Sequence, residues 1–353
     1  MTLELGHGMR LHLAAAGGWH GADAACLPAP QHAGLLLEYA RQRELTLPAA
    51  TRRAAGAALL SPRALLDLLV EVARADQAPD TAFLLGQAWW PGHAGAASHA
   101  LAHAADLGQA LTLLTEQATA LSPLLTPRWI LGPRHAVVYW LDACGAPAQR
   151  NLLVDLHLSA LVAMARWQSG TELPWAICLN RPKPATRDHL ALHLGPELHF
   201  GCQLDALLIE RSWLHRPWPR GQGMAAEAAR RALAAPDHRP TTALPAALYD
   251  HLMHQLVAGS APGLDDTAVA LRTSPASLKR ALARHHSHFQ AELDQARAHL
   301  AMHLFHHHGL ANDEVARRLG FHDSTNFRRS FKRWTGMTPS RLREAMGFRG
   351  ALA

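Results

Sequence analysis

Apolar residues recur at helical spacing from about residue 34 to residue 125, in segments bounded by Ser-Pro pairs and glycines. Between Trp129 and Leu141 the composition becomes β-rich around a Gly-Pro turn signal, and the apolar run at 137–140 predicts a half-buried strand. Helices followed by strands and a further helix are typical of an α+β domain. The later elements that the pattern predicts are a helix over about 151–168, a strand over 175–179 and a short helix over 224–235.

The pattern near the end of the chain is helical. Residues 313–319 make a short amphipathic segment, Gly320 marks a tight turn, and a second helix begins at Asp323 or Ser324, either of which can cap it. This layout is typical of a helix-turn-helix, whose second helix enters the DNA major groove. The aromatic residues that share one side of the second helix, and so predict its packing face, are Phe327, Phe331 and Trp334.

The opposite side of this second helix is basic and polar. Arginine pairs bidentately with guanine, asparagine pairs with adenine, and a threonine methyl can meet that of thymine, so this face can read bases. Lys332 and Arg333 lie further along and are better placed for phosphates, which give affinity rather than sequence choice. An ordinary solvated basic face is the alternative interpretation. The DNA contacts expected from this helix are Ser324, Thr325, Asn326, Arg328, Arg329, Lys332 and Arg333.

A weaker helix-turn-helix pattern lies upstream, over residues 264–301. The aspartates at 265–266 open a helix, residues 271–274 make the turn, and Pro275 occupies the first position of the next helix. A longer helix follows, with an apolar stripe from Leu293 to Leu304. The DNA contacts expected from this unit are Ser274, Ser277, Lys279, Arg280 and Arg284.

The downstream unit carries a dense motif, made of Val315-Ala316, Leu319-Gly320-Phe321, Phe327, Phe331-Lys332-Arg333, Gly336, Pro339 and Arg343. With this spacing it resembles the second helix-turn-helix of AraC/XylS-family transcription regulators. The resemblance implies that the upstream pattern is the first unit and that the longer helix connects the two. It implies an all-α domain whose two recognition helices enter successive major-groove segments about 34 Å apart.

Three positions of the first unit depart from that family pattern. Arg272 and His286 replace glycines that are usual in the family, and Ala276 stands where members often carry a larger, contacting side chain. We therefore expect the first unit to bind DNA mostly through its basic side chains and its backbone. The second unit should carry more of the sequence discrimination.

The earlier part of the chain shows a less specific motif, made of Gly86, Gly92, Gly95, Ala100, Ala104, Asp106-Leu107, Ala110-Leu111, Leu194-Gly195 and 200–205. These residues resemble the arabinose-binding-like N-terminal domain of a subgroup of the same family. The resemblance then covers about 35–345 and implies an effector pocket, although no residue identifies arabinose or another effector. A cupin-like barrel is the rival, but the helical stretch before residue 125 argues against it.

These patterns predict a flexible leader at 1–30, an α+β effector-binding and dimerisation domain at 31–215, a linker at 216–243 and a double helix-turn-helix domain at 244–347. The leader has too short an apolar stretch and too few early basic residues for a signal peptide. Nine of the ten tryptophans precede residue 219, which fits either ordinary core packing or a tryptophan-lined pocket.

Positive charge is concentrated toward the end of the chain. Residues from 241 onward include 14 Lys and Arg against 9 Asp and Glu, whereas residues 1–240 hold 20 against 19. Double-stranded DNA is the polyanion that would meet this excess. The four cysteines have no zinc-binding spacing, and no apolar run approaches the length of about 18 residues that a membrane span needs. We therefore expect a cytoplasmic protein with reduced thiols and no membrane contact.

Histidine is abundant, with 25 residues, and His303 and His307 are one helical turn apart. No H-E-x-x-H pattern accompanies this pair, so we expect neither a metal nor a cofactor. His285, His286 and His288 are expected near DNA phosphate or solvent, where protonation would add positive charge. A nucleophile elbow, a phosphate-binding glycine loop and a paired Cys-His signature are missing from the sequence, so an enzyme is not expected.

The sequence therefore predicts a transcription regulator that recognises promoter DNA sequence-specifically and responds to a small-molecule effector. A homodimer and RNA polymerase are its further expected partners. Two other classes stay open. An enzymatic N-terminal domain would turn over its bound effector, and a ligand-binding or scaffolding protein with a weakened first unit would bind DNA without sequence preference.

Overall fold

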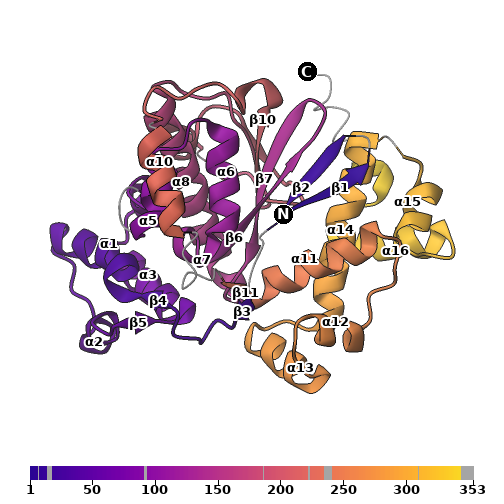
Figure 1. Cartoon of the computed structure of the whole chain (residues 1–353), viewed down its shortest axis with the longest axis horizontal. Helices are drawn as coiled ribbons and strands as arrows, with labels where there is room; N and C mark the ends of the chain where they lie inside the picture. Colours follow the sequence, from indigo (N-terminus) through magenta and orange to yellow (C-terminus); the bar gives the residue numbers. More distant parts are fainter. Residues whose placement is uncertain are drawn as a thin grey trace.

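A seven-stranded mixed sheet lies at the centre of the molecule, with helices on both of its faces (Figure 1). The computed structural model describes residues 1–6, 8–13, 18–90, 94–185, 187–221, 223–233, 241–308 and 310–342, without the side chains of residues 54 and 306–308. Within the sheet, β8 and β9 are parallel and the other neighbouring strands are antiparallel. In spatial order its strands are β1 (Thr2–Gly6), β2 (Met9–His12), β6 (Leu125–Leu131), β7 (His135–Asp142), β10 (Ala206–Glu210), β8 (Ala176–Leu179) and β9 (Leu198–Phe200).

The beginning of the chain belongs to this sheet, so the flexible leader expected at 1–30 is wrong for most of that range. Strand β2 pairs with β6 and β1 pairs with β2. The reason is a period-two pattern, in which Leu5, Met9, Leu11 and Leu13 all point to one face and are buried there. Two small sheets complete the strands: β3 (Gly18–His20) pairs with β11 (Thr241–Ala243), and β4 (Leu27–Pro28) pairs with β5 (Leu59–Leu60).

One face of the large sheet is covered by the helices of the first two thirds of the chain (Figure 1). Helix α3 begins where Ser61 caps it, since the Ser61 side chain accepts a hydrogen bond from the backbone N–H of Ala64. The helices are α1 (Ala29–Gln42), α2 (Ala49–Ala55), α3 (Pro62–Asp76), α4 (Thr81–Gln87), α5 (Gly95–Ala102), α6 (Leu107–Glu116), α7 (Ala118–Leu121), α8 (Arg150–Ser169), α9 (Asp188–Leu194) and α10 (Gly223–Leu233), with 3₁₀ turns at Pro147–Gln149 and Arg211–Trp213.

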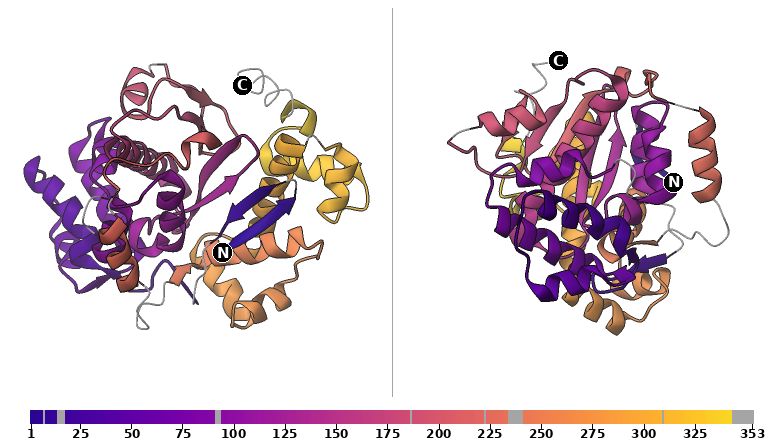
Figure 2. Two further views of the ribbon diagram at one scale, coloured as in Figure 1. Left: turned by 45° about the horizontal axis from the view of Figure 1, so that its top comes forward. Right: turned by 90° about the vertical axis from the view of Figure 1, so that its left-hand side faces the viewer.

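The other face of the sheet is covered by the C-terminal helices, which lie behind it in the right-hand view of Figure 2. These are α11 (Leu244–Val257), α12 (Leu264–Ala270), α13 (Pro275–Arg284), α14 (Phe289–His308), α15 (Asn312–Arg318) and α16 (Ser324–Thr335). The expected α+β domain, the all-α domain and the long connector helix, α14, are thus confirmed. The linker expected at 216–243 contains α10, close to the helix predicted there, and ends in β11.

Strand β7 shows why the sheet is buried on both sides. Val138 and Trp140 face the N-terminal helices, whereas Val137 and Tyr139 face the C-terminal helices. The expectation of a half-buried strand was therefore wrong at 137–140. The unbroken apolar run is typical of a strand covered on both faces.

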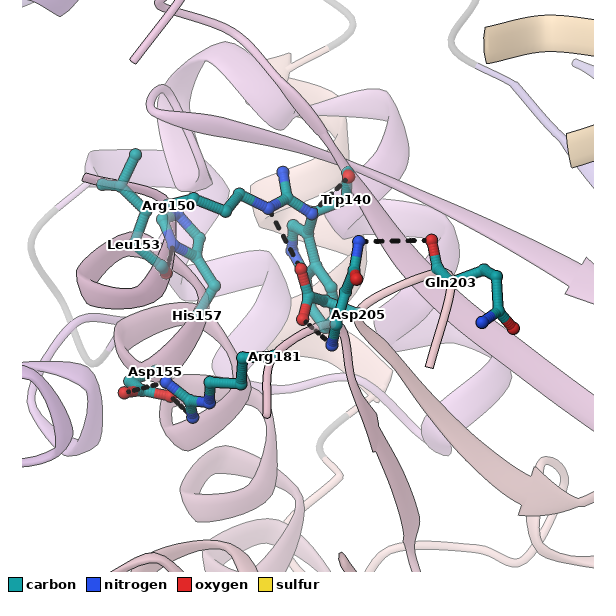
Figure 3. Close-up of polar contacts among 9 residues, drawn as sticks. Trp140, Arg150, Leu153, Asp155, His157, Arg181, Gln203 and Asp205 are labelled. Carbon is teal, nitrogen blue, oxygen red and sulfur yellow. Dashed lines mark hydrogen bonds and ion pairs between the residues drawn. The ribbon is translucent and has the colours of Figure 1, made fainter. Parts of the chain in front are cut away.

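A polar network fixes the loops at one end of the sheet against α8 (Figure 3). The Asp205 carboxylate accepts hydrogen bonds from Arg150 Nε at 3.1 Å and from the backbone N–H of Asn180 at 2.7 Å. The guanidinium of Arg181 forms a second ion pair, with Asp155 on α8, in which Nη1 and Oδ2 are 2.9 Å apart. Asp205 ends the motif at 200–205, and this network gives that residue a structural role.

Candidate nucleic-acid interface

Helix α16 is capped and packed as the second helix of a helix-turn-helix should be. Asp323 is the N-cap, and its Oδ1 accepts a hydrogen bond from the backbone N–H of Asn326 at 2.7 Å. Phe327 and Phe331 are fully buried, and both rings contact Phe305 of the connector α14. The helix therefore has one fixed inner face, which leaves its outer face to the solvent.

The outer face of α16 exposes Thr325, Asn326, Arg328, Arg329, Lys332 and Arg333, whereas Ser324 is half-buried. Within the described part of the chain, no hydrogen bond or ion pair engages the side chains of Arg329 and Lys332. The helix carries no acidic residue of its own. Its outer face is therefore a cationic surface on which two long side chains can adapt to a partner.

Four of the expected contacts are engaged within the protein. Asn326 Nδ2 donates to Asp323 Oδ2 at 2.6 Å, and Arg328 Nη2 lies 3.3 Å from the hydroxyl of Thr325. Arg333 is paired with Asp294 of α14, with 3.0 Å between Nη2 and Oδ2. An exposed pair of this kind contributes little to stability and can be exchanged for a phosphate contact.

The first unit places its expected contacts on α13. Ser274 is the N-cap and its hydroxyl accepts a hydrogen bond from the backbone N–H of Ser277 at 3.2 Å. Arg280 Nη2 donates to the Ser277 hydroxyl at 3.1 Å, and Lys279 is exposed beside it. Leu278 and Leu282 are fully buried on the inner side, as their spacing suggests.

Both turns of the first unit adopt left-handed backbone conformations without glycine. Arg272, between α12 and α13, has φ of 54°, and His286, between α13 and α14, has φ of 53°. In the second unit the corresponding turn residue is Gly320, with φ of 78°. Side chains with a Cβ are strained in this region. These two substitutions therefore retain the conformation that favours glycine.

The end of α13 is docked on the N-terminal domain. The backbone N–H of Ala22 donates to His285 Nε2 at 3.2 Å, and Arg63 Nη2 donates to the carbonyl oxygen of Arg284 at 2.8 Å. Burial lowers the pKa of His285, whose side chain is almost fully enclosed. The expectation that His285 lies near phosphate or solvent is wrong, because the N-terminal domain covers it. The guanidinium of Arg284 also approaches Asp23, at 4.0 Å.

A buried polar interface holds α11 and α14 on the sheet, and no sequence pattern predicts it. Arg128 of β6 donates through Nε and Nη2 to the two carboxylate oxygens of Asp250, at 2.7 and 2.6 Å. The hydroxyls of Tyr139 and Tyr249 are 2.8 Å apart, and His299 Nδ1 lies 3.1 Å from the Tyr249 hydroxyl. These residues are far apart in sequence, so no local spacing relates them.

The structure does not test whether His303 and His307 bind a metal ion together. His303 is buried and its ring lies 6.3 Å from that of Tyr139, while the side chain of His307 is outside the described residues. Among the side chains that the structure does describe, no three His, Cys, Asp or Glu residues are grouped to hold a metal ion. Over the same residues, no helix is both long and apolar enough to cross a membrane.

Two family models match the chain. Residues 42–218 match the arabinose-binding domain at the N-terminus of AraC transcription regulators, and residues 267–345 match a helix-turn-helix domain. The solved structure of the transcriptional regulator CdpR from Pseudomonas aeruginosa has 20% sequence identity and a TM-score of 0.45, and the match covers 89% of this chain and 98% of that chain.

Curated relatives match over a shorter region. The Ornithine utilization regulator of Pseudomonas aeruginosa is 44% identical over 87 residues, which are 25% of this chain and 26% of that protein. An uncharacterized HTH-type transcriptional regulator of Mycobacterium tuberculosis is 38% identical over 82 residues, which are 23% of this chain and 24% of that protein. The matched region thus spans about a quarter of the length of each relative.

Proposed function

The chain belongs to the AraC family of DNA-binding transcription regulators, and from this premise we propose that it recognises promoter DNA sequence-specifically under the control of a small effector. The effector is held by the arabinose-binding-like N-terminal domain in this proposal. Neither arabinose nor ornithine is implied, because those words describe other members of the family.

The outer face of α16 carries the proposal. Arg329 and Lys332 are exposed on a capped helix whose inner face is fixed by two buried phenylalanines. An arginine in the major groove can read guanine through two hydrogen bonds, whereas a lysine further along the helix neutralises a phosphate. We assign sequence discrimination to Arg329 and non-specific affinity to Lys332.

The first unit has a different part in this proposal. Its exposed cations, Lys279 and Arg280, support phosphate contacts, and small Ala276 offers no base-reading group. The two units of one chain engage adjacent major-groove segments, and a homodimer of chains in the cytoplasm presents four such units to a promoter and to RNA polymerase. The orientation of the first unit relative to the N-terminal domain then decides how well both units fit DNA.

Effector control follows from the way the two domains are joined. The ion pair of Arg128 with Asp250 and the docked turn at His285 connect the sheet to the DNA-binding helices. An effector that favours one arrangement of these contacts shifts the population of DNA-competent molecules. The size of the shift is limited by its difference in affinity for the two arrangements.

The test is fluorescence anisotropy of the purified chain with labelled fragments of the promoter beside its own gene. Unlabelled competitor DNA and a salt titration separate specific from non-specific binding. Arg329→Ala should weaken binding to the preferred fragment by about 1–3 kcal/mol and relax the choice at one base pair. Lys332→Ala should weaken binding to all fragments alike and reduce the salt slope by about one.

Arg53→Ala is the matched control, since Arg53 is an exposed arginine on α2, outside the helix-turn-helix units. This variant removes the same charge as Arg329→Ala. It should leave both the affinity for the preferred fragment and the salt slope unchanged. Equal losses on every fragment for Arg329→Ala and Lys332→Ala would contradict the division of roles. Salt-labile binding without preference for any fragment, with and without cell extract as an effector source, would contradict sequence-specific recognition.

A further inference from the structure

We propose that the N-terminal domain binds an uncharged, amphipathic small molecule in a cavity between α1, α5, α7, α10 and β11, and that this cavity is the effector site. The proposal rests on the function proposed above and gives it a location and a ligand class. The cavity has a volume of about 390 Å³. Small-molecule sites in proteins fall between about 300 and 1,000 Å³, so this space suits a compact metabolite.

The lining of the cavity favours a ligand without formal charge. Gln31 and Thr119 provide an amide and a hydroxyl, while Leu27, Ala97 and Leu233 provide apolar surface. Among the described residues of the wall there is no Lys, Arg, Asp or Glu. From these described residues a charged ligand would gain no counter-ion in return for its lost hydration, which is strongly unfavourable, whereas a few polar groups can be paired.

His32 gives the wall a fixed imidazole. Its Nδ1 lies 3.0 Å from the carbonyl oxygen of Pro28 and its Nε2 lies 3.1 Å from that of Ala120. Both ring nitrogens are therefore held against the backbone of two different elements. Burial lowers the pKa of His32, although the two carbonyl contacts act in the opposite direction. The ring joins α1 to α7 at the wall of the cavity.

A smaller space of about 10 Å³ continues from the same wall toward Trp89 and Trp90. It has room for about one water molecule. The indole N–H groups of both tryptophans donate to the carbonyl oxygen of Leu121, at 3.2 and 2.7 Å. These tryptophans therefore close the end of the cavity as core residues, and the ligand volume lies on the side of α5, α10 and β11.

Strand β11 forms part of the wall, which relates the cavity to DNA binding. Thr241 of β11 lines the cavity, and its carbonyl oxygen accepts a hydrogen bond from the Thr119 hydroxyl. Strand β11 pairs with β3, where Thr242 lies opposite Trp19 (Figure 1). The indole N–H of Trp19 donates at 2.9 Å to the carbonyl oxygen of Leu271, in the turn of the first helix-turn-helix.

A continuous set of contacts therefore runs from the cavity to the first DNA-binding unit. A ligand that changes the position of Thr241 acts on β3 directly, because His20 Nδ1 also lies 3.0 Å from the Thr241 hydroxyl. The two arrangements of the first unit, docked and released, are the states that the ligand selects between.

The first experiment uses Cys26 as a reporter, because it lines the cavity and is half-buried, whereas the other three cysteines are buried. Methyl methanethiosulfonate should label Cys26 in the native full-length chain, as followed by peptide mass spectrometry. Benzamide and benzoate have nearly the same shape and differ in charge. Millimolar benzamide should slow the labelling of Cys26 at least twofold, and benzoate should have no effect.

A cavity-filling variant provides a test that needs no ligand. Ala120→Leu places three more carbons on the cavity wall and should leave the midpoint of thermal unfolding unchanged or slightly higher. Ala110→Leu makes the same change at a fully buried alanine of α6 and should lower the midpoint by several degrees. Ala120→Leu should also remove the protection of Cys26 by benzamide.

If both leucine variants lowered the midpoint equally, Ala120 would not face a cavity. If benzoate protected Cys26 as well as benzamide does, the ligand would not have to be uncharged. Labelling of Cys26 that benzamide does not slow would overturn the site, as would protection by benzamide that persists unchanged in Ala120→Leu. Promoter binding by the same preparation is measured in parallel. Specific DNA binding with an inert cavity would leave the proposed regulator intact, whereas protection of Cys26 with unspecific DNA binding would remove the proposed function and retain the ligand site.

Discussion

The two helix-turn-helix units have the same construction but are held in different ways. In the second unit glycine occupies the left-handed positions, at Gly320 and Gly336, with φ of 78° and 73°. In the first unit Arg272 and His286 occupy such positions, with φ of 54° and 53°. The N-terminal domain holds the first unit through main-chain and side-chain contacts, which include the hydrogen bond from Trp19 to the Leu271 carbonyl oxygen.

The difference suits the second unit to the recognition of DNA and the first unit to the transmission of changes from the N-terminal domain. The second unit has glycine at its left-handed positions and keeps Arg329 and Lys332 exposed, which suits recognition of DNA. Its contact with the sheet side among the described residues includes a hydrogen bond from Gln203 to the weakly accepting sulfur of Met337, at 3.2 Å. The first unit depends on tertiary contacts, so a change in the N-terminal domain reaches it first. Four substitutions or conditions test this contrast.

The largest effect is expected from Asp250→Ala, which leaves the buried guanidinium of Arg128 without its carboxylate. Arg128 is fully buried and Asp250 is 10% exposed. Removing one partner of a buried pair lowers the free energy of unfolding by about 3–5 kcal/mol. Chemical denaturation measures it. The double variant Arg128→Met/Asp250→Leu should lose much less, and a loss as large as that of Asp250→Ala would show that packing rather than the unpaired charge is responsible.

Gly145→Ala should release the first unit while leaving the second in place. A Cβ at Gly145 would lie 2.1 Å from the carbonyl oxygen of His285, so the docked turn must move. We expect a loss of about 1–3 kcal/mol and faster hydrogen exchange over residues 271–290. Gly201→Ala is the matched control, with the same φ of 67° and no atom within 4 Å of the new Cβ. Equal changes in both variants would attribute the effect to backbone strain alone.

Acidification should weaken the same docking contact. Burial lowers the pKa of His285 below its ordinary value and lowers that of neighbouring His20 to about 4. Nearby Asp142 opposes the lowering at His285 and Arg63 adds to it. Since the folded pKa values lie below the ordinary 6.5, the unfolded state binds more protons. The stabilisation that depends on neutral His285 and His20 is then fully present above pH 6.5 and is lost as the pH decreases toward 4.

The slope is at most about 1.4 kcal/mol per pH unit for each histidine, and hydrogen exchange at pH 7.5 and pH 5.5 can follow it in the docked turn. His285→Gln keeps an acceptor for the backbone N–H of Ala22 and removes one titrating group. This variant should reduce the pH dependence of hydrogen-exchange protection over residues 271–290. A slope that is unchanged in this variant would assign the effect to other groups.

The sequence predicted what is encoded locally. The cap of α16, the start of α13 at Pro275, the aromatic inner face with Phe327 and Phe331, and the unusual turn residue Arg272 all follow from short-range patterns, and the structure has them where the patterns placed them. Strand β7 and helix α8 were also found from their periodicity. Whether the basic side chains bind DNA stays a prediction.

Contacts between distant segments could not be predicted. The pairing of Arg128 with Asp250 joins a strand to a helix 122 residues later, and no spacing rule relates two such positions. The docking of His285 on Ala22 has the same character, because the two residues are 263 positions apart in the sequence. Strand β1 differs, because the alternation of Leu3 and Leu5 is a local pattern that predicts a strand, although the composition of this segment does not.

The smallest expected effect concerns the turn residues themselves. Arg272→Gly should relieve a strained left-handed backbone, although glycine also makes the unfolded chain more flexible. The net gain in unfolding free energy should be about 0.5–1 kcal/mol. Gly320→Ala is the mirror-image change in the second unit and should lose about 1 kcal/mol, since its new Cβ meets no atom within 4 Å and only the backbone conformation opposes it. If Arg272→Gly instead destabilised the chain, the Arg272 side chain would be stabilising the first unit. The backbone conformation of the turns would then no longer distinguish the second unit, proposed to recognise DNA, from the first unit, which the N-terminal domain holds in place.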